Sequence, residues 1–217
     1  MNGTNLLAIA PKLTKVKSLC INSRMFMLAH IPMALVILRG AIAPVLVGMA
    51  WDGHTSWGWV LLYCLAVLSD IFDGIIARRL GVSTAALRKA DSWADRGLYV
   101  CVAIAAWLAH PDVILAFKLP LLTILGLQGI WWIVNLAKYG QPASYHTYTA
   151  KAWGLTLLVA AIALFGYGYG GVTLWAAILI GVIHTLEELA MTWALPTWHH
   201  DVLSLGHALE IRKQLSS

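Results

Sequence analysis

The chain has 217 residues, of which 60% are hydrophobic and only 12% are charged. Soluble domains typically carry about 25% charged residues, so this composition excludes an ordinary water-soluble protein and predicts one embedded in a lipid bilayer. The net charge of +5 arises from basic residues that flank apolar runs, which indicates anionic lipid headgroups rather than nucleic acid as their partners.

Residues 1–25 are predicted to form a cytoplasmic segment that lies on the membrane surface. Basic and apolar side chains alternate in this segment, as they do in an amphipathic helix in the headgroup region. The basic ones are Lys12, Lys15, Lys17 and Arg24. The apolar stretch before Pro11 is too short for the core of a cleavable signal peptide. A frayed basic tail is the alternative for this segment.

Six apolar runs follow, each close to the roughly 20 residues that a membrane-spanning helix needs. They are residues 26–50, 57–78, 85–109, 113–137, 152–168 and 172–195. The connections between them are short, and no repeat or soluble domain interrupts residues 26–195. We therefore predict an all-α fold, a six-transmembrane-helix bundle followed by a cytoplasmic tail at residues 196–217.

The orientation of the bundle follows from the distribution of Lys and Arg. These residues gather before the first run, around the second and fourth connections, and after the last run. Because cytoplasmic loops carry an excess of Lys and Arg, both termini are predicted to be cytoplasmic. Tryptophans at the ends of the runs are expected to lie in the two interfacial belts; they are Trp51, Trp57, Trp59, Trp193 and Trp198.

Four of the ten acidic residues lie within 26 positions, on the second and third apolar runs. Asp70 and Asp73 are three residues apart and Asp91 and Asp95 are four apart, so each pair shares one face of its helix. Gly81 can end the second helix, and Ser83 or Thr84 can cap the third. The tight turn predicts that both pairs lie at a similar depth, just inside the cytoplasmic surface.

Four carboxylates in an apolar environment repel one another and are costly to bury. Arg78 and Arg96 can each pair with one of them, but hard divalent cations with a preference for oxygen ligands suit the whole cluster better. Two metal ions about 3.5–4 Å apart would form a clamp for phosphoryl displacement. A charged crevice, or the ion pathway of a divalent-cation transporter or channel, is the alternative. A pathway would continue outward with polar residues, whereas the outer halves of these runs are apolar.

The sequence around the four aspartates resembles the signature of the CDP-alcohol phosphatidyltransferase family, D-x2-D-G-x2-A-R-x8-G-x3-D-x3-D. The chain reads Asp70-Ile71-Phe72-Asp73-Gly74-Ile75-Ile76-Ala77-Arg78, and after eight residues it continues with Leu87, Asp91 and Asp95. Every fixed position matches except the second glycine, which is Leu87 here. A weaker resemblance to the family's IPNxLTxxR…P opening runs from Ile31 to Arg39 and on to Pro44, with Met33 and Val36 at the usual Asn and Thr positions.

The resemblance implies a role for each matching residue. Asp70, Asp73 and Asp91 would hold two metal ions, Mg²⁺ or Mn²⁺, and Asp95 would complete their ligands and act as the general base. Gly74 and Ala77 would let a nucleotide approach the helix backbone, and Arg78 would bind the phosphates of the donor. Leu87 either narrows the cytidine site or, in a shifted turn, faces lipid. None of the four aspartates is missing, which argues against a non-catalytic, lipid-binding relative.

The implied activity is phosphatidyl transfer from a CDP-linked lipid donor such as CDP-diacylglycerol to a small hydroxyl acceptor, with release of CMP, in phospholipid biosynthesis. The family resemblance also implies six spans, an active site that faces the cytoplasm, location in a bacterial inner membrane, and a possible homodimer. The sequence does not identify the acceptor alcohol.

Two further groups of polar residues lie outside the signature. Lys138, His146 and Lys151 fall in the polar stretch 138–151 and can bind an anionic acceptor, although a solvated loop with basic residues explains them equally well. In the sixth run, His184, Glu187 and Glu188 are ionisable residues within the membrane; we expect a structural pairing of this group with Arg39 or Arg96. The histidines between 199 and 207 are expected in a solvated amphipathic tail.

Overall fold

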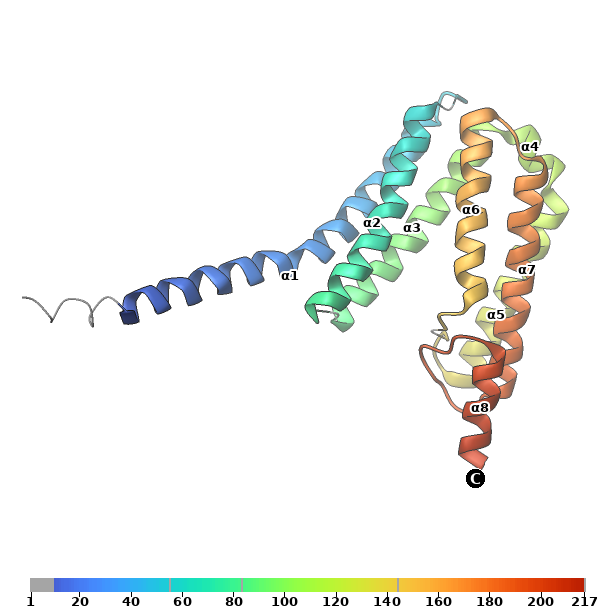
Figure 1. Ribbon diagram of the computed structural model, residues 1–217. Coiled ribbons are helices and arrows are strands. Elements are labelled where there is room, and N and C mark those ends of the chain that lie inside the picture. The colour runs from blue at the N-terminus through green and yellow to red at the C-terminus, as the bar shows by residue number, and fades with distance from the viewer. Residues whose placement is uncertain (1–9, 55, 83, 144, 217) are drawn as a thin grey trace, which may run out of the picture. The chain divides into compact units, whose positions relative to one another are not determined.

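The structure is a computed structural model that describes residues 10–216 except 55 and 83 and 144, with side chains from His30 onward except those of residues 85 and 216. The described residues form eight helices and no β-strand. They are α1 (Ala10–Met49), α2 (Trp57–Leu80), α3 (Ala85–Ala109), α4 (Pro111–Ala116), α5 (Lys118–Tyr139), α6 (Tyr148–Tyr167), α7 (Gly171–Ala194) and α8 (Leu205–Ser216) (Figure 1).

Five helices among the described residues are long and apolar enough to cross a membrane. They are the part of α1 from His30 to Met49 and the whole of α2, α5, α6 and α7. The third predicted span, 85–109, forms the 25-residue helix α3 with the predicted bounds. Its first half carries five charged residues between positions 88 and 96, which makes it more polar than the other five. The all-helical fold is thus confirmed for the described residues, with five candidate membrane spans by length and composition.

The chain divides into two compact units. The first contains the described part of Met1–Met49 together with Leu61–Ala105, and the second contains Ala50–Val60 together with Ala106–Ser217. The first unit therefore holds most of α1, α2 and α3, and the second holds α4 to α8. The described part of the predicted segment 1–25, from Ala10 onward, belongs to the first unit and forms the beginning of α1, which ends at Met49.

The tight turn in the first unit matches the sequence prediction. Gly81 has a φ of +66°, a left-handed conformation that glycine adopts without the penalty of a Cβ atom. The amide of Val82 donates to the carbonyl of Ala77 at 3.1 Å, which ends α2. The hydroxyl of Thr84 accepts from the amide of Leu87 at 3.1 Å, so Thr84 caps α3. Ser83, the other predicted cap, lies outside the described residues.

In the second unit, α7 packs against α5, α6 and α8. Its buried residues recur at three- and four-residue intervals; they are Ala177, Ile178, Gly181, His184, Thr185, Glu188, Met191, Thr192 and Ala194. Gly181 allows α6 to approach closely, since a Cβ atom there would lie 2.6 Å from the indole nitrogen of Trp153.

The observed boundaries of the fourth and fifth predicted spans differ from the prediction for local reasons. The fourth, expected at 113–137, is divided into α4 and α5 at Phe117. Pro120 cannot donate to the carbonyl four residues earlier, so a new helix begins at Lys118 and places this proline in its first turn. The fifth begins at Tyr148 rather than 152, because the Thr147 hydroxyl accepts from the amide of Ala150 at 3.1 Å.

Two other segments are more buried than the sequence suggested. Trp59, expected in an interfacial belt, is completely buried and stacks on Phe165 with ring centroids 3.5 Å apart. The expected cytoplasmic tail contains α8 and is part of the second unit, where Val202 and Ala208 are buried in a cluster with Met191.

Candidate metal centre

The four aspartates of the signature, referred to below as the aspartate cluster, come from two adjacent helices of the first unit. Asp70 and Asp73 lie on α2, and Asp91 and Asp95 lie on α3. Asp70, Asp91 and Asp95 can each offer one ligand atom such that all three atoms lie within 4.8 Å of one another. The sequence prediction that the two pairs converge across the turn is confirmed for these three residues.

Arg39 from α1 contacts every member of the aspartate cluster. Its Nη1 atom lies 2.5 Å from Oδ1 of Asp70, and its Nη2 atom hydrogen-bonds to Asp91 and lies 3.5 Å from Oδ2 of Asp73. Its Nε atom lies 3.2 Å from Oδ1 of Asp95. One guanidinium thus joins three helices. A planar fork with five N–H donors is suited to such multiple carboxylate contacts.

The sequence offered Arg78 and Arg96 as partners for two of the four carboxylates, and the ion pairs of the described residues show Arg39 in that role instead. The Arg78 guanidinium folds back over its own helix, so that a Cβ atom on Gly74 would lie 3.3 Å from Nη1. The Arg96 guanidinium lies over the Trp93 ring, 5.6 Å from its centroid. A signal for Arg39 was present, because it is the only Lys or Arg in the run 26–50.

Burial changes in steps across the site. The side chain of Arg39 is completely buried and that of Asp73 is 7% exposed, whereas those of Asp70, Asp91 and Asp95 are 35–44% exposed. Arg39 and Asp73 therefore form the floor of the site, and the other three carboxylates stand at its open side. The buried Oδ2 atom of Asp73 has no hydrogen-bond partner.

The charge of the site is incompletely compensated. Four carboxylates and one guanidinium leave a formal charge of −3 (−4 + 1) among helices that are largely apolar. A buried carboxylate oxygen without a partner is costly, and an all-oxygen set with open positions fits hard divalent cations such as Mg²⁺ or Mn²⁺. The residues present therefore fit a divalent-metal centre.

The positions at which this chain departs from the family signature meet in one apolar cluster. Leu87 of α3 is 9% exposed and packs with Val36 of α1 and Ala77 of α2, and Met33 packs against the same cluster. The alternative in which Leu87 faces lipid is therefore excluded. Gly74 and Arg78 lie on α2 near this cluster, and Ala77, expected to face a nucleotide, is 5% exposed.

The three residues predicted to bind an acceptor lie in the second unit, at or near the connection between α5 and α6. Lys138 lies in the last turn of α5, and its Nζ atom donates to the Thr192 carbonyl at 2.7 Å. His146 is 66% exposed and lies 3.4 Å from Asp201. Lys151 lies in α6 rather than in a loop, with its Nζ atom 5.4 Å from the Tyr148 ring centroid.

His184, Glu187 and Glu188 do not take the expected arginine partners. With Thr147 and Thr149 they form what we call the α7 polar cluster. The Nδ1 atom of His184 lies 3.4 and 3.3 Å from the two threonine hydroxyls, and its Nε2 atom lies 3.8 Å from Glu188. Glu187 accepts from the Thr149 hydroxyl at 2.5 Å and, at 3.2 Å, from the first amide of α8. Arg39 is instead engaged by the aspartate cluster.

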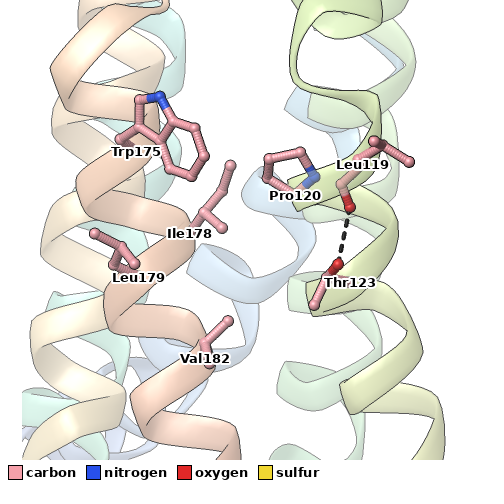
Figure 2. Close-up of a pocket in the computed structure, with 7 residues that line it drawn as sticks. All are labelled: Leu119, Pro120, Thr123, Trp175, Ile178, Leu179 and Val182. Carbon is pink, nitrogen blue, oxygen red and sulfur yellow. Dashed lines mark hydrogen bonds between the residues drawn. The ribbon is translucent and has the colours of Figure 1, made fainter.

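A groove of about 350 Å³ lies between α5 and α7 in the second unit. Figure 2 shows its lining, which is apolar apart from Thr123, and the hydroxyl of Thr123 already donates to the carbonyl of Leu119 at 3.0 Å. The groove has no titratable side chain, so it offers no group for proton transfer or metal binding.

Comparison with known proteins agrees with the geometry of the first unit. A family model described as CDP-alcohol phosphatidyltransferase matches residues 29–183, a range that includes Arg39, the aspartate cluster and the two threonines of the α7 polar cluster. No curated protein and no solved structure matches the chain.

Proposed function

Because this chain belongs to the CDP-alcohol phosphatidyltransferase family, we propose that it transfers a phosphatidyl (phosphoalcohol) group from a CDP-linked lipid donor to a small hydroxyl acceptor. CDP-diacylglycerol is the donor we favour, and CMP is the leaving group. The observation that carries the proposal is the aspartate cluster, in which four carboxylates from two helices share a single arginine.

We propose that the aspartate cluster holds two divalent ions, Mg²⁺ or Mn²⁺. When bound, such ions neutralise the charge that develops on the transferred phosphate and on the departing CMP. The fit rests on the carboxylate oxygens on the open side, on the buried Oδ2 of Asp73, which accepts no hydrogen bond, and on the residual charge of −3.

Asp95 is proposed as the general base. The acceptor hydroxyl gives its proton to the Asp95 carboxylate while its oxygen forms a bond to the lipid-side phosphorus of the donor. The bond between this phosphorus and the oxygen that leads to CMP breaks, and CMP leaves with that oxygen and its electron pair. A base within hydrogen-bonding reach of the proton is the geometric requirement, and the partial exposure of Asp95 is compatible with such access.

We propose that Gly74 and Arg78 contact the donor. The Arg78 guanidinium has the planar fork that pairs with phosphate oxygens, and Gly74 leaves the helix backbone bare beside it. Ala77 and Leu87 pack below, against Val36, so they would limit how deeply the cytidine enters rather than hydrogen-bond to it.

Lys138, His146 and Lys151 are proposed to attract an anionic acceptor. His146 is the most available of the three, because its side chain is 66% exposed and contacts the equally exposed side chain of Asp201. Lys138 already donates to a helix carbonyl, so it would bind an acceptor with its remaining donors.

For the membrane arrangement we propose six spans, with α3 as the sixth because its charged half belongs to the metal centre. Both termini and the active site would then face the cytoplasm, as the Lys and Arg distribution requires. A bacterial inner membrane is the proposed location, and a homodimer is the proposed assembly.

A divalent-cation transporter or channel is the competing function, and the composition of α2 argues against it. From Trp59 to Leu68 the outer part of α2 carries no charged residue, whereas an ion pathway would continue with polar groups across the membrane.

The deciding experiment is incubation of the purified protein in detergent with CDP-diacylglycerol, Mg²⁺ and a panel of small alcohols, with release of CMP as the readout. We expect CMP release that depends on one class of alcohol, and none from Asp95→Asn. Absence of CMP release with every alcohol, in protein that binds Mn²⁺, would contradict the proposed reaction.

A further inference from the structure

We propose that Arg39 is an internal counter-ion that stands in for metal: it keeps the aspartate cluster assembled without divalent cations and thereby weakens their binding. Arg39 is a positioning residue in this proposal, not a catalytic one. The inference rests on the proposed metal centre and concerns how that centre is loaded.

The geometry separates Arg39 from an ordinary salt-bridge partner. Its guanidinium reaches all four carboxylates of the cluster, and its side chain is completely buried beneath them. The printed contacts involve Oδ1 of Asp70, Asp91 and Asp95 and Oδ2 of Asp73. The partly exposed oxygens of Asp70, Asp91 and Asp95 lie on the side from which an ion can enter.

Loss of Arg39 should affect the metal-free and the metal-bound protein to different extents. Without metal, loss of Arg39 makes the formal charge of the site more negative, from −3 to −4, and removes a group that contacts every member of the cluster. With metal bound, the same loss removes those contacts but also removes the repulsion between a buried positive charge and a divalent ion a few ångströms away. Loss of Arg39 therefore destabilises the metal-free protein more than the metal-bound protein. Because such coupling is reciprocal, the variant must bind metal more tightly.

The test compares Arg39→Met with Arg96→Met. Methionine is similar to arginine in length. Arg96→Met is the control, because it also removes one positive charge, from the residue that follows Asp95 in sequence and whose guanidinium lies over the Trp93 ring. Mn²⁺ binding to the purified proteins in detergent is measured by electron paramagnetic resonance, without donor or acceptor. We expect the dissociation constant of Arg39→Met to fall about tenfold, whereas that of Arg96→Met stays within about twofold of the parent.

Thermal unfolding supplies a second readout that does not depend on turnover. In chelator, Arg39→Met should unfold at a lower temperature than the parent. Saturating Mn²⁺ should raise the unfolding temperature of Arg39→Met by more than it raises that of Arg96→Met. A variant that is monodisperse with Mn²⁺ and aggregates in chelator supports the proposal for the same reason. If Arg39→Met folds in neither condition, Arg39→Gln is the variant to measure, because it removes the positive charge and keeps a hydrogen-bond donor, and tighter Mn²⁺ binding than in the parent is again expected.

Unchanged or weaker Mn²⁺ binding in the folded Arg39 variant would overturn the proposal, because Arg39 would then only orient ligands or support the helices. A parent protein that binds no Mn²⁺ would overturn both the metal centre and this inference. A parent protein that binds Mn²⁺ but does not release CMP would contradict the proposed reaction without contradicting the role of Arg39.

Discussion

Two regions of the molecule place ionisable groups among apolar helices, and they differ in how these groups are paired. In the first unit, four aspartates share one arginine, and a buried oxygen of Asp73 accepts no hydrogen bond. In the second unit, every polar side chain of the α7 polar cluster has a neighbour of matching chemistry, either a hydroxyl, a backbone amide or another member. The first region retains a buried carboxylate oxygen without a hydrogen bond, whereas no such atom is found among the described members of the α7 polar cluster.

The difference separates a site for a ligand from a structural network. Buried polar groups in proteins are normally hydrogen-bonded, so an uncompensated group suggests that a ligand completes it. The second unit extends its satisfied network to the end of α7, where Lys138 and Tyr139 contact the carbonyl oxygens of Thr192 and Leu195. Burial raises the pKa of the Tyr145 hydroxyl, which therefore stays neutral in its contact with Thr192.

Removal of divalent metal is expected to have the largest effect on transfer. Excess chelator should reduce CMP release to less than about 1% of the starting rate, because the carboxylates alone would repel an anionic donor. Re-addition of Mg²⁺ or Mn²⁺ should restore the rate. Ca²⁺ should compete, because its looser coordination suits in-line transfer poorly. Full activity in chelator would remove the metal centre from the mechanism.

Substitutions within the aspartate cluster are expected to have the second-largest effect on transfer. Asp95→Asn is expected to lower kcat by about 10²–10⁴-fold through loss of the general base, and Asp91→Ala should abolish transfer through loss of a metal ligand. Both proteins should fold in detergent, since removal of one of four acids reduces repulsion. Asp112→Asn in α4 is the control and should retain the parent rate. Near-normal turnover of Asp95→Asn would exclude the base role.

The sequence predicted the parts of this comparison that depend on local spacing. Asp70 and Asp73 at three residues, Asp91 and Asp95 at four, and Gly81 in the turn determine which carboxylates converge, because helix periodicity and turn chemistry are local. The partner of the cluster was not predicted. Arg39 is 31 residues from Asp70, and its contact depends on how α1 packs against two other helices.

A similar limit applies to the buried surfaces of the second unit. Trp59 reads as an interfacial tryptophan from its position at a helix end, and only the stacked ring of Phe165, more than 100 residues later, makes it a core residue. The tail behaves alike: its polar composition suggests solvent exposure, yet Val202 and Ala208 close a cluster with Met191. In both cases a distant segment supplies the burial.

Leu87→Gly should have a moderate effect that is confined to the donor. Leu87 packs against Val36 and Ala77, so its removal opens space beside the proposed nucleotide contacts and should change the donor KM at least about threefold. The free energy of unfolding should fall by roughly 2–5 kcal/mol, the typical loss for a large-to-small core substitution. The concentration of Mg²⁺ for half-maximal rate should not change.

Leu87→Met is the matched control, because it conserves volume and should leave KM and kcat within about twofold of the parent. If Leu87→Gly also leaves both constants within about twofold, Leu87 does not border the nucleotide, and the three departures from the family signature affect packing only.

Thr192→Val should have the smallest effect on transfer and the clearest effect on stability. The Thr192 hydroxyl donates to the side-chain oxygen of Asn135 or to the carbonyl of Glu188, and it lies 3.2 Å from the hydroxyl of Tyr145. Valine has nearly the same shape but leaves buried partners unpaired, which typically lowers the free energy of unfolding by about 1–3 kcal/mol. Turnover per folded molecule should stay within about twofold of the parent, because the second unit's network is satisfied without a ligand.

Thr156→Val is the control, since the Thr156 hydroxyl donates to the Trp153 carbonyl of its own helix. Denaturant unfolding and CMP release measured on the same samples separate the two quantities. A large loss of turnover with unchanged stability would assign this network to the reaction and erase the contrast between the two units.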